Sequence, residues 1–204
     1  MYQKYFKRAI DFVLALGGIL CLSWLLAGLA VAIKLDSPGP VFFKQKRVGI
    51  HKTHFAIYKF RTMRADTPHD MPTHLLADPD RYITRVGKFL RRTSLDELPQ
   101  LWNILRGDMA VIGPRPALWN QYDLLAERDK YGANDVRPGL TCLAQIHGRD
   151  ELEIPVKAKL DGDYVAHITF WGDVKCFMDT IGVVLRHDGV VEGGTGTLHR
   201  QHKD

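Results

Sequence analysis

The feature that most constrains this chain is a stretch of 22 residues, Phe12 to Ile33, that contains no charged side chain. Folded as a helix it would be about 33 Å long, at about 1.5 Å per residue, and the hydrocarbon core of a bilayer is about 30 Å thick. A helix buried in a soluble protein normally carries a polar stripe, which this stretch lacks. It is also longer than the apolar part of a cleaved signal peptide, and it runs directly into Lys34. We therefore predict that it inserts into a membrane.

Basic residues flank the apolar stretch on both sides, and positive charge marks the cytoplasmic side of a membrane. A re-entrant helical hairpin satisfies both flanks, because its two ends return to one face; Gly17-Gly18, Ser23 and Gly28 are candidate bend points. A straight span is the alternative, and the heavier charge after the stretch then still places residues 34–204 in the cytoplasm. The flanking residues are Lys4, Lys7 and Arg8 before the stretch, and Lys34, Lys44, Lys46, Arg47 and Lys52 after it.

Charge divides the chain into two unequal parts. Residues 1–64 contain eleven Lys or Arg and two acids, a net charge of +9, whereas residues 65–204 have a net charge of −4. The basic part indicates an anionic partner, and both acidic lipid and nucleic acid fit that charge. The adjacent membrane segment favours lipid. Three scattered cysteines form neither a disulfide framework nor a metal motif, which favours a reducing compartment.

The rest of the chain has the composition of one globular domain, with 46% hydrophobic and 25% charged residues overall. Short strands are predicted at residues 41–43 and 55–58, around a polar turn, and helices at 117–131 and 155–186. Residues 81–92 form a basic amphipathic pattern that suits a membrane surface, although an ordinary surface helix has the same pattern.

Together these elements predict an α/β fold that is mostly helical. A cluster of Pro and Gly after Asp36 marks where the chain leaves the membrane. We therefore place the membrane-associated re-entrant helix at residues 1–36 and the globular domain at residues 37–190. Residues 191–204 are polar and are predicted to form a flexible tail. Residues 66–80, rich in Pro, Asp and His, are predicted to form a loop whose histidines fit solvent exposure better than metal ligation.

The stretch from Thr93 to Gly107 carries the strongest chemical signal. Its apolar residues recur at helical spacing, and Gly107 ends the pattern. Ser94 and Glu97 have the spacing of a capping box, so Asp96 and Glu97 are expected in the first turn. On this motif alone, the simpler interpretation is that both carboxylates cap the helix and complement its dipole. The alternative is a site for a hard cation with an adjacent nucleophile.

Cationic side chains around this motif favour the second interpretation. Arg91 and Arg92 lie just before it, and Lys59 stands between two aromatic residues on a predicted strand. Downstream, Arg115 lies between two prolines in Gly113-Pro114-Arg115-Pro116. Arginine makes bidentate contacts with phosphate oxygens, and a rigid loop loses little entropy when it presents one, so this segment suits a phosphate. A simple turn with a solvated arginine is the alternative.

Further short motifs follow one another in order along nearly the whole chain. They are Lys7-Arg8 with Asp11, Leu35 to Val41, Tyr58 to Met63, Ile83 to Gly87, Thr93 to Trp102, Gly107 to Met109, Gly113 to Pro116, Arg137 to Thr141, Gly148-Arg149 and Asp173 to Lys175. In this order they resemble the bacterial sugar transferase family, and within it the small monotopic phosphoglycosyl transferases. So many ordered motifs are far more specific than a lone Asp-Glu pair.

The resemblance implies a two-step reaction. Asp96 attacks the β-phosphate of a UDP-sugar, releases UMP and holds the phosphosugar covalently. Polyprenyl (undecaprenyl) phosphate then accepts the sugar phosphate, which is the first membrane step of bacterial glycan assembly. Mg²⁺ is the implied cofactor, with Asp96 and Glu97 as catalytic and metal-contacting residues. The implied phosphate-binding residues are Lys59, Arg91 and Arg115, and Asp173 belongs to the functional set without an assigned role.

The implied architecture is a re-entrant membrane hairpin plus a small cytoplasmic catalytic domain, with amphipathic helices lying on the bacterial inner (plasma) membrane. The implied partners are a UDP-sugar, polyprenyl phosphate and membrane lipids, with no nucleic acid; the sugar and homodimer formation stay open. Two positions depart from the family pattern: Ser23 is followed by Trp24 where the family usually has Ser-Pro, and Cys142 stands where glycine is frequent. The competing hypothesis is a non-enzymatic membrane-anchored adaptor that binds acidic lipid or nucleic acid through its basic face.

Overall fold

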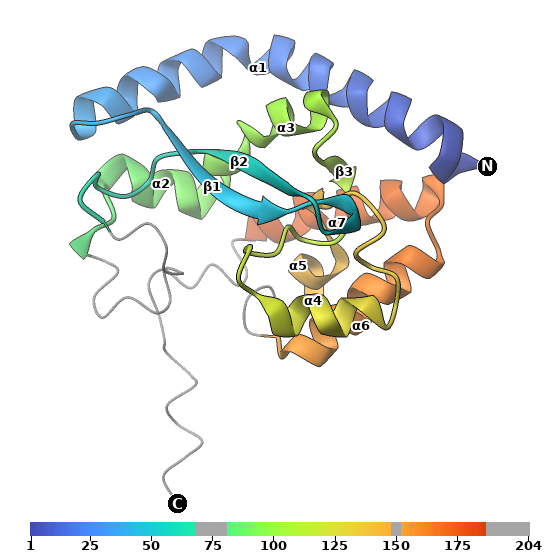
Figure 1. The fold of residues 1–204 in the computed structure, drawn as a ribbon. Helices are drawn as coiled ribbons and strands as arrows, with labels where there is room; N and C mark the ends of the chain where they lie inside the picture. Colours follow the sequence, from blue (N-terminus) through green and yellow to red (C-terminus); the bar gives the residue numbers. More distant parts are fainter. Residues whose placement is uncertain (68–80, 148–151, 187–204) are drawn as a thin grey trace, which may run out of the picture.

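The computed structural model describes residues 1–67, 81–147 and 152–186, and helices dominate it (Figure 1). Two small two-stranded sheets accompany them, so the predicted α/β, mostly helical class is confirmed. Most of the predicted loop at 66–80 and the predicted tail at 191–204 lie outside the described residues. The helices are α1 (Lys7–Asp36), α2 (Arg85–Thr93), α3 (Gln100–Arg106), α4 (Tyr122–Asp129), α5 (Leu143–His147), α6 (Ile154–Ala166) and α7 (Phe170–Arg186), and the strands are β1 (Phe42–Val48), β2 (His54–Phe60), β3 (Ala110–Ile112) and β4 (Gly139–Thr141).

The apolar stretch forms one uninterrupted helix, α1, which arches across the rest of the molecule (Figure 1). The re-entrant hairpin is therefore not confirmed, because no break interrupts the helix at Gly17-Gly18, Ser23 or Gly28. The physical reason lies at residue 24. Trp24 keeps the backbone donor that a proline would remove, so the helical hydrogen-bond ladder stays intact. Ser23 only donates its hydroxyl to the carbonyl of Leu20, at 2.9 Å.

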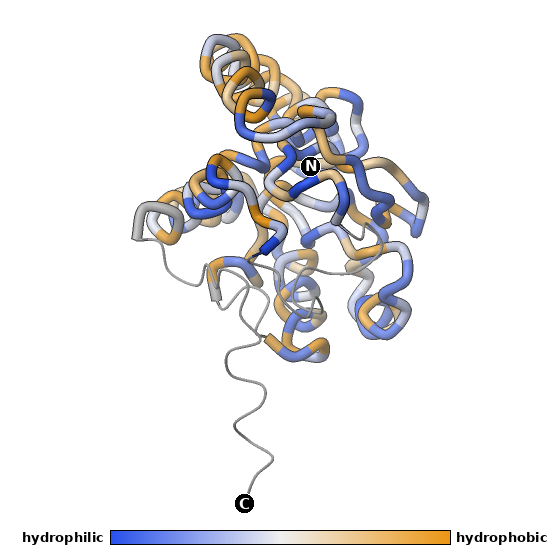
Figure 2. The backbone as a smooth tube through the Cα atoms, turned by 90° about the vertical axis from the view of Figure 1, so that its left-hand side faces the viewer, coloured by the Kyte–Doolittle hydropathy of each residue, from blue (hydrophilic) through white to orange (hydrophobic). Residues whose placement is uncertain are grey.

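One side of α1 packs on the domain along nearly the full helix. Lys7, Asp11, Ala15, Leu29 and Ile33 are buried there. The opposite side is apolar and exposed, and the coil of α1 at the top of Figure 2 is largely orange. By length and hydropathy α1 is able to cross a membrane. Its exposed apolar residues include Phe12, Val13, Leu16, Leu20, Trp24 and Val31.

The end of α1 is tied to the following elements by two polar side chains. The buried guanidinium of Arg61, just after β2, donates to the carbonyls of Ser37, at 2.7 Å, and of Pro38. Asp36 accepts the backbone N–H of Val86, in the first turn of α2, at 3.0 Å. The end of β2 and the start of α2 are thereby held beside the C-terminus of α1.

The predicted strand pair is confirmed as the antiparallel hairpin β1–β2, in which Phe42 lies opposite Phe60 and Val48 opposite His54. The predicted helices at 81–92, 117–131 and 155–186 correspond to α2, to α4, and to α6 with α7. The parallel pair β3–β4 was not predicted. Each strand has three residues, too few to show a periodicity, and parallel partners lie far apart in the sequence.

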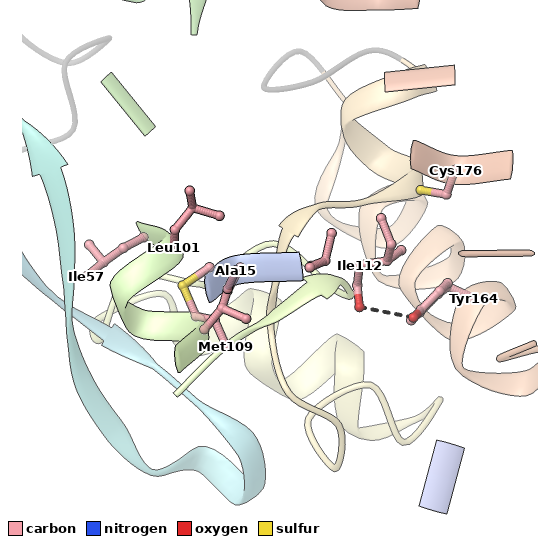
Figure 3. Packing of buried hydrophobic residues seen from close by; sticks show 9 residues of the cluster. Ala15, Ile57, Leu101, Met109, Ile112, Tyr164 and Cys176 are labelled. Atoms are coloured by element: carbon pink, nitrogen blue, oxygen red, sulfur yellow. Dashed lines mark hydrogen bonds between the residues drawn. The ribbon is translucent and has the colours of Figure 1, made fainter. Parts of the chain in front are cut away.

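The main hydrophobic core joins α1 to the domain (Figure 3). Ala15 of α1 packs there with Leu101 of α3, Met109 and Ile112. Tyr164 of α6 closes the core, and its hydroxyl oxygen lies 3.0 Å from the carbonyl oxygen of Ile112. Because Ala15 is fully buried in this cluster, the long apolar helix α1 is also part of the domain core.

Gly87 allows α2 to lie directly on the backbone of Thr62, because a Cβ at this position would collide with the Thr62 carbonyl. We expect Gly87→Ala to lower the free energy of unfolding by about 1–3 kcal/mol through overpacking against backbone. Denaturant unfolding followed by circular dichroism measures the change. Gly182→Ala in α7 is the matched control, since nothing lies within 4 Å of a Cβ there. Equal stability of the two variants would contradict the tight contact.

Candidate active site

Asp96 and Glu97 lie in a short 3₁₀ turn, Leu95–Glu97, between α2 and α3. Ser94 ends α2 in the left-handed conformation, with φ of 56°, and its side chain makes no capping bond. The predicted capping box is therefore wrong. Pro99 is the N-cap residue of α3, where a missing backbone donor costs no helical hydrogen bond, and α3 begins at Gln100. Both carboxylates consequently lie on a turn ahead of α3.

The Glu97 carboxylate is held by two cations. Its Oε1 atom lies 2.6 Å from Lys59 Nζ of β2 and 3.3 Å from Arg115 Nη2. Burial alone raises the pKa of Glu97, but the charges of Lys59 and Arg115 outweigh it and hold that pKa at about 2. Glu97 is thus ionised at neutral pH and fixes the positions of both cations.

The Asp96 carboxylate differs from that of Glu97 in its partners and in its pKa. Within the part of the chain that the structure describes, it makes no hydrogen bond or ion pair. Loss of solvation raises the pKa of Asp96 to about 6, and the negative charge of Glu97 adds to this, although nearby Lys59 and Arg91 oppose it. A carboxylate of raised basicity that still ionises near neutral pH is suited to act as a nucleophile.

Arg91 completes this group of cations from α2. Its Nε donates to Thr62 Oγ1 at 2.9 Å, and its charge acts on Asp96. The close approach of Gly87 to Thr62 sets the distance between α2 and the end of β2, and so places Arg91. The structure therefore brings together Asp96, Glu97, Lys59, Arg91 and Arg115, which lie up to 56 positions apart in the sequence.

Asp173 lies apart from that cluster. It sits in the first turn of α7 and accepts hydrogen bonds from Lys7 Nζ at 2.6 Å, Tyr2 Oη at 2.7 Å and Tyr164 Oη at 2.8 Å. These partners surround the N-terminal end of α1, whereas the Asp96 turn follows α2, which packs near Ile33. The visible role of Asp173 is to hold α1 on α7. Sequence reasoning did not identify Lys7 and Tyr164 as its partners, because no local pattern links residues so far apart.

The acidic residues of the site offer one uncommitted carboxylate to Mg²⁺. Among the described residues, no group of three or more His, Cys, Asp or Glu is arranged to hold a metal ion. Glu97 is engaged by Lys59 and Arg115, which leaves Asp96 as the uncommitted carboxylate. Because Mg²⁺ typically binds one or two carboxylates and completes its octahedron with waters and substrate phosphates, this donor set fits an ion shared with a phosphate ligand.

In protein freed of divalent metal, we expect the Asp96 carboxyl to titrate with a midpoint of about 6. Lys59→Met should raise this midpoint further, because it removes the cation that lowers it most, and Glu97→Gln should lower it by removing a like charge. Carbon-13 NMR of labelled aspartate carboxyls against pH measures it, with the signal assigned from an Asp96→Asn sample. A midpoint near the ordinary value of 3.8 would argue against the desolvated environment.

Comparison with known proteins identifies relatives over most of the chain. Residues 2–187 match the profile of the family described as "Bacterial sugar transferase". The chain is 37% identical over 194 residues to the uncharacterized sugar transferase EpsL of Bacillus subtilis (strain 168), covering 95% of this chain and 94% of that protein. It is 40% identical over 187 residues to the UDP-glucose:undecaprenyl-phosphate glucose-1-phosphate transferase of Escherichia coli (strain K12), covering 88% of this chain and 40% of that protein.

A third relative is the undecaprenyl-phosphate galactose phosphotransferase of Salmonella typhimurium, 34% identical over 201 residues, covering 92% of this chain and 42% of that protein. The chain thus spans nearly all of EpsL but less than half the length of the two relatives that are named for a sugar. The matched region contains the Asp96 turn and each of the cations around it. The chain belongs to the bacterial sugar transferase family, a family of enzymes.

Proposed function

We propose that this protein transfers a sugar-1-phosphate from a UDP-sugar to polyprenyl phosphate and releases UMP. The observation that carries the proposal is the Asp96 carboxylate, which has a raised pKa and no protein partner among the described residues, yet lies among Lys59, Arg91 and Arg115. The relatives in Escherichia coli and Salmonella typhimurium support it, because both are named as transferases that act on undecaprenyl phosphate and the first is named for a UDP-sugar donor.

In the first step, an Asp96 carboxylate oxygen attacks the β-phosphorus of the UDP-sugar. The bond from that phosphorus to the bridging oxygen breaks, and UMP departs with the bridging oxygen and its electron pair. In the second step, a phosphate oxygen of the polyprenyl phosphate attacks the same phosphorus and displaces Asp96. The product is a polyprenyl-diphosphate-sugar, and the carboxylate is regenerated.

The cations contribute binding and charge stabilisation. Arg115 and Arg91 suit the phosphate oxygens of the donor, since guanidinium groups form bidentate contacts with phosphate. Lys59 is held in place by Glu97, so its charge is already positioned when a substrate arrives. Asp96, supported by Glu97, would hold Mg²⁺ together with the donor diphosphate, and the bound ion would neutralise charge that develops on the phosphate oxygens.

We place the continuous helix α1 shallowly in the cytoplasmic leaflet of the bacterial inner membrane, so that both of its ends lie at the cytoplasmic face. The domain lies alongside the helix from Lys7 to Ile33, so a straight span would carry α2 and α3, which pack on α1, into the hydrocarbon. Positive charge on both flanks favours the cytoplasmic side. The acceptor carries its phosphate at the bilayer surface. A shallow position of α1 therefore brings the acceptor phosphate and the Asp96 turn to the same level.

The test of the activity is incubation of the purified protein with Mg²⁺, polyprenyl phosphate and a panel of UDP-glucose, UDP-galactose and UDP-N-acetylgalactosamine. We expect release of UMP that depends on one or more of these donors. The adaptor hypothesis predicts a different outcome, namely tight, salt-sensitive binding to acidic liposomes or oligonucleotides without UMP. That result would remove the proposed function.

The test of the topology is labelling of Gln3→Cys in a Cys21→Ser background, since the other two cysteines are buried. A membrane-impermeant thiol reagent should reach residue 3 only after the cells are permeabilised. Labelling from outside intact cells would instead place the N-terminus across the membrane and support a straight span.

A further inference from the structure

The loop that carries Arg115 is held by its backbone. Four consecutive carbonyl groups, from Pro114 to Ala117, each accept a hydrogen bond from outside the loop. Two donors are backbone N–H groups and two are arginine side chains, so the loop is fixed before any ligand binds. The four bonds are Gly139 N–H to Pro114 at 2.9 Å, Arg128 Nη2 to Arg115 at 2.9 Å, Arg47 Nη1 to Pro116 at 3.0 Å and Val48 N–H to Ala117 at 3.0 Å.

Arg128, in α4, is the side chain that reaches the carbonyl of Arg115 itself. Its guanidinium is buried and is paired with Asp161 of α6, which is 1% exposed. The Asp161 Oδ2 atom lies 2.6 Å from Arg128 Nη2 and 2.8 Å from Nε. A packed apolar pair would hold α4 on α6 at least as well as a buried ion pair, because both charges lose their hydration. The pair is therefore weak evidence for a stabilising role, whereas its two bonds to one Asp161 oxygen fix the orientation of the guanidinium.

Arg115 in turn contacts the Asp96 turn, Leu95–Glu97. The Arg115 guanidinium donates to Glu97 Oε1 at 3.3 Å, and its side chain is 35% exposed, so a ligand is able to reach it. Pro114 and Pro116 restrict the backbone on either side. The position of the Arg115 carbonyl therefore determines where its side chain starts, and a displaced guanidinium would bind the donor phosphates less tightly.

We propose that Arg128, oriented by Asp161, is a positioning residue that aims the Arg115 guanidinium at the diphosphate of the donor. Arg128 acts through the Arg115 carbonyl and not on the substrate. The inference rests on the proposed function, because the donor diphosphate is the ligand that Arg115 meets.

The test replaces both charges together, as Arg128→Met/Asp161→Leu, so that neither is left buried without a partner. We expect the unfolding midpoint to change little, while the KM for the UDP-sugar rises about tenfold and kcat falls by less than about threefold. Arg128→Lys is the second variant. It keeps a charge beside Asp161 but loses the planar fork that also reaches the Arg115 carbonyl, so the same rise in KM is expected.

The decisive comparison is made in an Arg115→Ala background. If Arg128 acts through Arg115, the double replacement should change kcat/KM there by less than about twofold. The control is Lys52→Gln/Asp129→Asn, which removes an ion pair of the same 2.6 Å length, half exposed, at the neighbouring position of α4. This control should leave the KM unchanged.

Two results would overturn the inference: an unchanged KM in both Arg128 variants, or a loss that adds fully to that of Arg115→Ala. These outcomes differ from a failure of the proposed function, in which the unaltered protein releases no UMP from any donor. In that case the affinity for UDP is measured by calorimetry for the unaltered protein and for both Arg128 variants. Equal affinities would reject the positioning role.

Discussion

Replacing Asp96 with asparagine is expected to abolish UMP release, with a loss of at least about 10⁴-fold, because the amide lacks the nucleophilic oxygen on which the first step depends. The same variant should lose the covalent phosphosugar. Mass spectrometry of protein mixed with the UDP-sugar in the absence of polyprenyl phosphate detects this adduct, which should map to the peptide that contains Asp96 in the unaltered protein.

Asp163→Asn is the matched control, since Asp163 is an exposed aspartate on α6 and should keep full activity. Glu97→Gln distinguishes the role of Glu97 from that of Asp96. It should reduce the rate of UMP release without removing the adduct, because Glu97 positions Lys59 and Arg115. Turnover that persists in Asp96→Asn, or an adduct on another residue, would remove Asp96 as the nucleophile.

Asp173→Ala is expected to lower the free energy of unfolding by about 3–5 kcal/mol, because it leaves the ammonium group of Lys7 buried without its closest partner. Two tyrosine hydroxyls lose an acceptor as well. For a chain of this size, the loss corresponds to a decrease of roughly 6–20 °C in the midpoint of thermal unfolding, which differential scanning calorimetry in detergent measures.

Asp66→Ala is the control for this change. Asp66 pairs with Arg64 at 3.1 Å, but both side chains are 60% exposed, so solvent screens the pair and the midpoint of thermal unfolding should hardly change. The double variant Lys7→Met/Asp173→Asn removes the buried ammonium group and keeps an acceptor for both tyrosines. It should recover part of the stability, because the buried Asp11 carboxylate still loses Lys7, which lies 3.9 Å away. If Asp173 only holds α1 on α7, activity should return with it. A stable but inactive double variant would instead assign Asp173 a chemical role.

Local sequence patterns predicted much of this protein, since they depend on residues close together in the chain. The uncharged run from Phe12 to Ile33 predicted α1, and two short apolar stretches around a polar turn predicted the hairpin β1–β2. The Asp-Glu pair and the proline-flanked Arg115 pointed to phosphate chemistry before any fold was known. The family resemblance, built on such motifs, also proved correct.

The path of α1 depended on tertiary packing. The two basic flanks predicted a bent hairpin, but the chain lacks the proline that would break the helix, and the buried stripe from Lys7 to Ile33 stabilises one continuous helix. The three-residue strands β3 and β4 exist only because they pair with one another across the fold.

The sequence by itself determined which chemical groups are present and where a long apolar helix forms, because composition and short-range periodicity are enough for both. Only the tertiary structure decided that Glu97 faces Lys59 and Arg115 instead of capping a helix, that Asp173 holds α1 and stands apart from Asp96, and that Arg128 reaches the carbonyl of Arg115. The physical reason is common to all three: these contacts join distant segments, and packing determines which buried charges meet.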